Sequence, residues 1–139
     1  MIEFASQGVE LPDIDIKRVS TWIEEVAASH SCRVGNLNYL FVDDEEIIKA
    51  NRQFVNHDYF TDIITFDYSR GDKIAGDIMI SLDTVKTNAE KFGVAYSEEL
   101  LRVIIHGVLH LVGINDKGPG EREIMEAAEN AALELYNNH

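Results

Sequence analysis

Residues 97–116 read SEELLRVIIHGVLHLVGIND, and this stretch decides the fold. Ser97 is a suitable N-cap, and the two glutamates after it suit the positive end of a helix dipole. From Leu100 to Val112 nearly every residue is apolar, so this helix should pack against neighbours on most of its sides. The stretch therefore predicts a central buried helix in which only three side chains are polar: Arg102, His106 and His110.

The segments on either side of this helix alternate between strand and helix patterns. Strands are expected at residues 2–4 or 9–11, 33–42, 62–68 and 74–82, and helices after Asp15, Asp43, Asp83, Ser97 and Gly120. The turn-like link at 69–73 predicts that the last two strands form an antiparallel hairpin. The chain is therefore predicted to be one α+β domain over residues 1–139, with a small mixed β-sheet of about four strands packed with about five helices.

Apolar periodicity predicts which face of each outer helix packs inward. The expected inward residues are Ile16, Val19, Trp22, Ile23 and Val26, then Ile47, Ala50 and Phe54, then Val85, Ala89 and Phe92, and finally Ile124, Ala128, Ala131 and Leu135. The other face of the last helix is strongly acidic. Gly93 is expected to end the helix that precedes the central one.

The two histidines of the central helix have the spacing of a metal site. His106 and His110 project from one helix face, one turn apart, so both imidazoles can bind one cation. Gly113 can take a positive φ and end the helix, which would bring Asp116 back toward the same metal. Two imidazoles and a carboxylate favour Zn²⁺, with Ni²⁺ or Fe²⁺ as alternatives, and three protein ligands leave one position for water, as in catalytic sites.

A plainer interpretation of each histidine is a hydrogen-bonded core residue. Two buried imidazoles in an apolar helix are costly unless they have partners, so the metal site is the favoured interpretation. Gly107 follows the first histidine, where helix-borne zinc peptidases carry the glutamate that acts as general base. Glycine supplies no base and disfavours the helix, which indicates close approach by another backbone or by substrate. Peptidase chemistry is therefore weakened.

The motifs together resemble the YbeY family of single-strand endoribonucleases, which mature rRNA in bacteria. The matching residues of the metal segment are His106, Gly107, Leu109, His110, Leu111 and Gly113. Residues 61–66 (TDIITF) and 76–81 (GDIMIS) resemble two strands of the family, and Asn51-Arg52 resembles the end of its preceding helix. The resemblance implies a zinc-dependent endoribonuclease that acts in rRNA maturation and ribosome quality control, in a single YbeY-like metal-dependent domain.

Two positions depart from the pattern of the family. Asp116 stands where the family has its third histidine, although a carboxylate also binds zinc. Val55 stands where the family has an arginine that could stabilise a scissile phosphate. His57 or Arg52 could supply the charge instead; the alternative is that both are exposed residues of no special role.

Two further polar residues are candidates for supporting roles. Arg102 lies one turn before His106 on the same face, where it could bind phosphate or, equally, pair with Glu98. Asp77 lies on the strand face opposite Ile78 and could orient a histidine ligand, although an ordinary strand residue is the plainer interpretation.

Composition limits the partners. The net charge of −13 argues against a broad, sequence-blind nucleic-acid surface, so DNA is not expected, whereas a locally positive cleft could still take single-stranded RNA such as an rRNA precursor. The charge also suits a basic small-subunit ribosomal protein, or serves solubility alone. Cys32 is the only cysteine, residues 1–4 do not resemble a secretion signal, and no segment is apolar enough for a membrane span. A cytoplasmic protein is expected.

Three functions remain open on these grounds. The first is the metal-dependent endoribonuclease. The second is a metallopeptidase with metzincin-like geometry or another metal hydrolase, for which Glu98 and Glu99 lie too far up the helix to replace the missing base. The third is a non-catalytic ribosome-assembly factor that docks a basic ribosomal protein.

Overall fold

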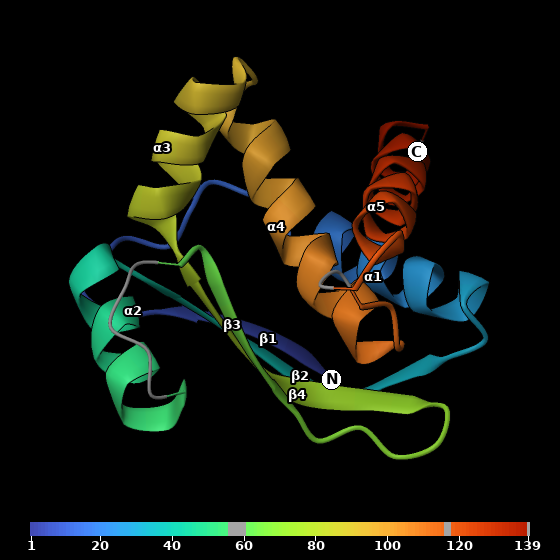
Figure 1. Cartoon of the computed structure of the whole chain (residues 1–139). Helices are drawn as coiled ribbons and strands as arrows, with labels where there is room; N and C mark the ends of the chain where they lie inside the picture. The colour runs from blue at the N-terminus through green and yellow to red at the C-terminus, as the bar shows by residue number, and fades with distance from the viewer. Residues whose placement is uncertain (56–60, 116–117, 139) are drawn as a thin grey trace.

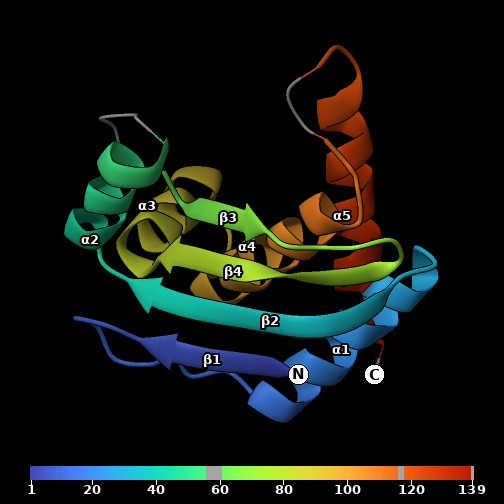
Figure 2. The same ribbon diagram turned by 90° about the horizontal axis from the view of Figure 1, so that it is seen from below.

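A four-stranded mixed sheet forms one layer of the molecule. The computed structural model describes residues 1–55, 61–115 and 118–138, with the backbone alone at 54 and 55. In the described residues the strands are β1 (Ile2–Ser6), β2 (Arg33–Val42), β3 (Ile63–Asp67) and β4 (Lys73–Ser81), in the order β1-β2-β4-β3. The first two pairings are parallel and β3 is antiparallel to β4 (Figure 2). The predicted hairpin and the mixed sheet are confirmed.

Five α-helices accompany the sheet within the described residues. They are α1 (Ile16–Ser29), α2 (Asp44–Ala50), α3 (Leu82–Phe92), α4 (Tyr96–Leu111) and α5 (Glu121–Asn137), and a π-helical turn, η1 (Asn51–Val55), extends α2. Figures 1 and 2 show α3, α4 and α5 on one face of the sheet. Residues of α2 pack with Ile64 of the other sheet face in a small second core. None of the described helices has the length and apolarity needed to cross a lipid bilayer.

The main core lies between the sheet and the helices, and α4 runs through it. Its buried residues include Val103, Ile104 and Val108, as the apolar pattern predicted. Tyr39 of β2 donates a hydrogen bond from its hydroxyl to the Ile104 carbonyl at 2.9 Å. On the far side, Trp22 Nε1 of α1 donates to the Ala132 carbonyl of α5 at 2.7 Å, which fixes the last helix against the first.

Most helix boundaries follow the prediction, including the end of α3 at Gly93 and the start of α5 after Gly120, whereas the starts of α3 and α4 differ. Asp15 and Asp43 cap α1 and α2. Ser81, and not Asp83, caps α3 by accepting from the Thr84 N–H, because β4 runs into this helix with no loop between them. The expected cap of α4 is also wrong: Ser97 lies inside the helix, and no side chain caps its start.

The buried face of α5 is rotated by one residue from the predicted one. Ile124 is 60% exposed, whereas its neighbour Met125 is buried. The buried set is Met125, Glu129, Ala132 and Leu133. The predicted and the observed buried sets have nearly the same spacing in this alanine-rich helix. The observed set faces inward because Glu129 belongs to it and hydrogen-bonds two side chains of α4. Two other expected inward residues, Ile16 and Phe92, are exposed.

Candidate metal centre

Close packing between α4 and the sheet explains Gly107. A Cβ at this position would lie 2.8 Å from Ile78 Cδ1 and 3.2 Å from Ile63 Cδ1. The predicted close approach is therefore confirmed, and side chains of β3 and β4, rather than backbone or substrate, are what approach. The side of α4 that carries residue 107 faces the sheet, so a glutamate there would point into the core.

The two histidines lie near the C-terminal end of α4. The His106 side chain is 24% exposed, whereas His110, one turn later, is exposed. Beyond Leu111 the helix ends as predicted: Gly113 has a φ of +108°, and the Ile114 N–H returns to the Leu109 carbonyl at 3.1 Å. Asp116, the third expected ligand, lies outside the described residues. Its role stays a prediction.

His106 is held by a carboxylate from α5. Its Nδ1 lies 2.7 Å from Oε2 of Glu129, whose other oxygen, Oε1, accepts from Arg102 Nη1 at 3.0 Å. Glu129 is only 8% exposed. An ionised carboxylate can only accept hydrogen bonds, so Nδ1 is the donor and the neutral ring carries its lone pair on Nε2. That nitrogen is the atom a metal ligand needs, so the observed hydrogen bond suits zinc.

Arg102 lies beside the candidate site and pairs with α5 rather than with Glu98. Besides Glu129, it donates from Nη2 to Oδ1 of Asn130 at 2.8 Å. These contacts connect α4 to α5, whereas the partner expected from the sequence was Glu98 of α4 itself. The guanidinium therefore supports Glu129 in the described structure, and phosphate binding by Arg102 stays a prediction.

A cavity of about 470 Å³ opens beside His106, between α4 and α5. Glu99 lines it and is only 5% exposed. Burial raises the pKa of the Glu99 carboxyl, the carboxylate of Asp62 raises it further, and Arg102 lowers it. Sequence reasoning missed Glu129 as a functional candidate, because a glutamate in a strongly acidic helix is typical of a solvent-exposed face. It also gave no sign that Glu99, considered only as a peptidase base, is buried.

The remaining sequence candidates lie apart from His106 or outside the described residues. Asp77 is exposed on the sheet face opposite Ile78, where its Oδ1 accepts from Asn38 Nδ2 at 3.1 Å, so it does not orient His106. Arg52 is exposed in η1. His57 is not among the described residues, nor is the side chain of Val55.

No cluster of three or more metal-binding side chains occurs within residues 1–55, 61–115 and 118–138. This range omits position 116, where the third ligand is expected. The described part of the centre is thus a pair of imidazoles on one helix face, one of them aligned by a buried carboxylate.

Comparison with known proteins assigns the family. The family model described as endoribonuclease YbeY matches residues 2–137. A protein named endoribonuclease YbeY from Phocaeicola vulgatus is 62% identical over 137 residues, covering 99% of each chain. Its namesake from Bacteroides thetaiotaomicron is 59% identical over 134 residues, covering 96% of this chain and 98% of the relative. The solution structure of TM1509 from Thermotoga maritima has a TM-score of 0.68 at 27% identity, covering 99% of this chain and 93% of that one. This chain therefore belongs to the endoribonuclease YbeY family.

Proposed function

We propose that this protein is a zinc-dependent single-strand endoribonuclease that acts in rRNA maturation and ribosome quality control. The observation that supports it best is the pairing of His106 and His110 on one face of α4, with His106 Nδ1 at 2.7 Å from Glu129. Relatives that cover nearly the whole chain carry the name endoribonuclease, which supports RNA as the substrate.

His106, His110 and Asp116 are the residues that would hold the metal. When bound there, zinc would supply Lewis acidity toward a phosphoryl oxygen or a water molecule. Ni²⁺ or Fe²⁺ would suit the same donors. The protein contributes the alignment of the first imidazole by Glu129. The adjacent cavity carries more glutamates than arginines, so RNA is expected to reach the metal from the exposed His110 side.

The packing of Gly107 weighs against peptide hydrolysis at this centre. The general base of helix-borne zinc peptidases would have to stand at this position, which faces Ile78 and Ile63. A proteolytic role would therefore need a base from another element. Phosphodiester cleavage relies more on electrostatic stabilisation of the phosphoryl group, which suits a site that lacks this base.

A strongly acidic surface disfavours nucleic-acid binding along a broad surface, so we propose that RNA contacts the protein only close to the metal site. The net charge of −13 also favours a basic small-subunit ribosomal protein as the partner that brings the enzyme to its substrate. Both partners belong to the cytoplasm of a bacterial cell. We include this location in the proposal.

The direct test compares His110→Ala with wild type on an rRNA precursor. Loss of the second imidazole should lower cleavage by at least about a hundredfold, since metal activation is worth several kcal/mol. His30→Ala is the matched control, because His30 is exposed at the end of α1, away from the cavity. Metal content of both variants is measured in parallel.

Equal cleavage by His110→Ala and wild type would point to a contaminating nuclease and end the proposal. Full complementation of a deletion strain by the same variant would favour the non-catalytic assembly factor instead.

A further inference from the structure

We infer that Glu129 is a positioning residue that sets the tautomer of His106 and so prepares this ring to bind the metal. The inference rests on the proposed metal centre and adds residues of α5 to it. It begins with the 2.7 Å separation between His106 Nδ1 and Glu129 Oε2. Neutral imidazole has one proton on two nitrogens, and a carboxylate beside Nδ1 keeps it there.

The second oxygen of Glu129 fixes the orientation of the carboxylate. Oε1 accepts from Arg102 Nη1 at 3.0 Å, and Arg102 also donates to Asn130 at 2.8 Å. Both oxygens therefore have assigned donors, and rotation of the carboxylate would break two hydrogen bonds. Arg102 and His106 come from one face of α4, so the carboxylate from α5 bridges adjacent turns of that helix.

Burial strengthens the hydrogen bonds that hold the Glu129 carboxylate. Glu129 is 8% exposed and Arg102 is half-buried, so water competes weakly for these hydrogen bonds. An ion pair in this setting is costly to leave incomplete, which is why both partners are expected to stay in place. A buried acid on an otherwise acidic helix is thus explained by its contact with the metal ligand.

Glu129→Gln tests the orientation of the His106 ring without disturbing the packing, because glutamate and glutamine have nearly the same shape. The amide oxygen should accept from Arg102, which leaves the amide NH₂ facing Nδ1. Two donors cannot face each other, so the ring proton is expected to move to Nε2, the wrong tautomer for the metal. Zinc affinity, measured by competition with a chromophoric chelator, should fall about tenfold to a hundredfold.

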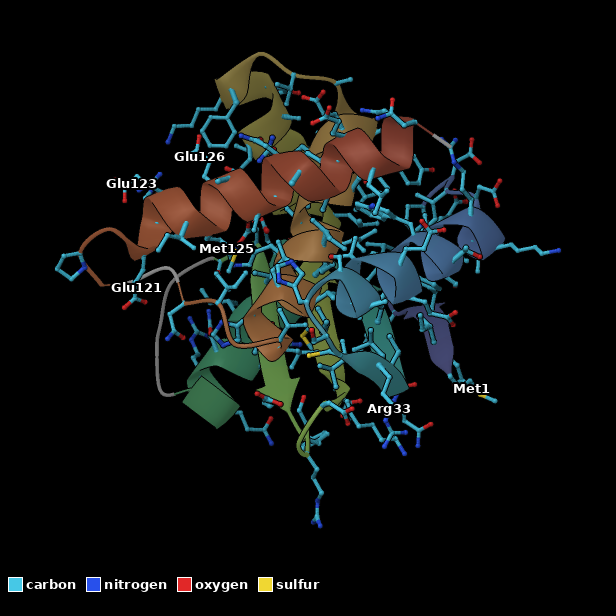
Figure 3. The ribbon with its side chains drawn as sticks, turned by 90° about the vertical axis from the view of Figure 1, so that its right-hand side faces the viewer. Met1, Arg33, Glu121, Glu123, Met125 and Glu126 are labelled. Carbon is cyan, nitrogen blue, oxygen red and sulfur yellow. The ribbon has the colours of Figure 1, made fainter. Side chains whose placement is uncertain are left out.

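The matched control is Glu126→Gln, one turn earlier on α5. Figure 3 labels Glu126, which lines the same cavity but is exposed. It removes the same charge without touching His106 in the described contacts, so zinc affinity should stay within a factor of about two of wild type. The double variant Arg102→Met with Glu129→Gln should recover affinity, because the amide oxygen can then turn to Nδ1.

Nitrogen NMR of the metal-free protein reads the tautomer without reference to activity. At a pH where the ring is neutral, wild type should carry the His106 proton on Nδ1, and Glu129→Gln should carry it on Nε2. This result would uphold the inference even if wild type bound no zinc, in which case the metal proposal alone would fail.

Three results would overturn it: a wild-type ring protonated on Nε2, equal affinities of a zinc-binding wild type and Glu129→Gln, or equal losses of affinity in Glu129→Gln and Glu126→Gln. The wild-type spectrum decides the question even if Glu129→Gln does not fold.

Discussion

At the residue scale, Gly107 both removes the general base of a peptidase and allows α4 to pack closely against the sheet. A methyl group there would lie 2.8 Å from the end of the Ile78 side chain. Overpacking typically costs 1–3 kcal/mol, whereas alanine gains about 1 kcal/mol over glycine in a helix interior. Gly107→Ala should therefore lower the free energy of unfolding by about 1 kcal/mol, as measured by urea denaturation. An increase would show that helix propensity outweighs the close contact.

Glu99 should make stability depend on pH. Burial and the carboxylate of Asp62 raise the pKa of Glu99 in the folded chain, so the folded state binds this proton more tightly than the unfolded state. Stability from this group is present in acid and is lost as the pH rises above the ordinary carboxyl value. Glu99→Gln should therefore be more stable than wild type at pH about 8, with a difference that shrinks toward pH about 5.

Chemical denaturation at the two pH values measures this difference. Glu24→Gln is the control, since Glu24 is exposed in the middle of α1 and is not among the groups that shift the pKa of Glu99. A Glu99→Gln advantage that stayed constant with pH would contradict the assignment.

Single residues were predictable where the chain itself imposes the geometry. The spacing of His106 and His110 places both on one helix face, and Gly113 takes the positive φ expected of a terminating glycine. Glu129 was not predictable, because its contact with His106 spans 23 residues and depends on how α5 is rotated. Periodicity gives the spacing of a buried stripe, but not which of two similar stripes faces inward.

At the scale of elements, Ser81 connects two helices. Its hydroxyl accepts from the Thr84 N–H to cap α3 and donates to Asp44 Oδ1 of α2 at 2.6 Å. Ser81→Ala should cost about 1–2 kcal/mol, since it leaves the Thr84 N–H uncapped and removes one of the two hydrogen bonds to Asp44 Oδ1, of which the Thr84 hydroxyl keeps the other. Thermal or urea unfolding measures the loss.

Ser97→Ala is the matched control for this cap. Ser97 is exposed inside α4 and makes no capping bond, so its replacement should change stability by less than about 0.5 kcal/mol. Comparable losses in the two variants would show that Ser97 caps α4 in solution.

The element boundaries show where sequence signals compete. Asp15 and Asp43 each precede a helix after a clear break in the pattern, so their capping role was readable. Ser81 ends a strand and caps a helix at once, and the aspartate two residues later is an equally good capping type, so residue type does not separate the two. The type and order of the elements followed from periodicity, whereas the cap of α3 depends on how β4 and α3 join.

At the scale of the whole molecule, the net charge of −13 works against compactness. Like charges repel more strongly in the folded chain than in the expanded one, and salt screens them over about 8–10 Å at physiological strength. Raising NaCl from low to moderate concentration should therefore raise the unfolding midpoint. Calorimetry over a series of NaCl concentrations measures the effect, and a lower midpoint in salt would indicate that local ion pairs dominate.

The tight fit of Gly107 also has a consequence for how this scaffold can change by mutation. In the genetic code, a glycine codon can become a glutamate codon through one nucleotide substitution, so the base of a zinc peptidase is a single genetic step away. That step would drive a long acidic side chain against Ile78 and Ile63. The change of chemistry is therefore blocked by hydrophobic packing behind the helix, and a lineage would first need smaller side chains at positions 63 and 78.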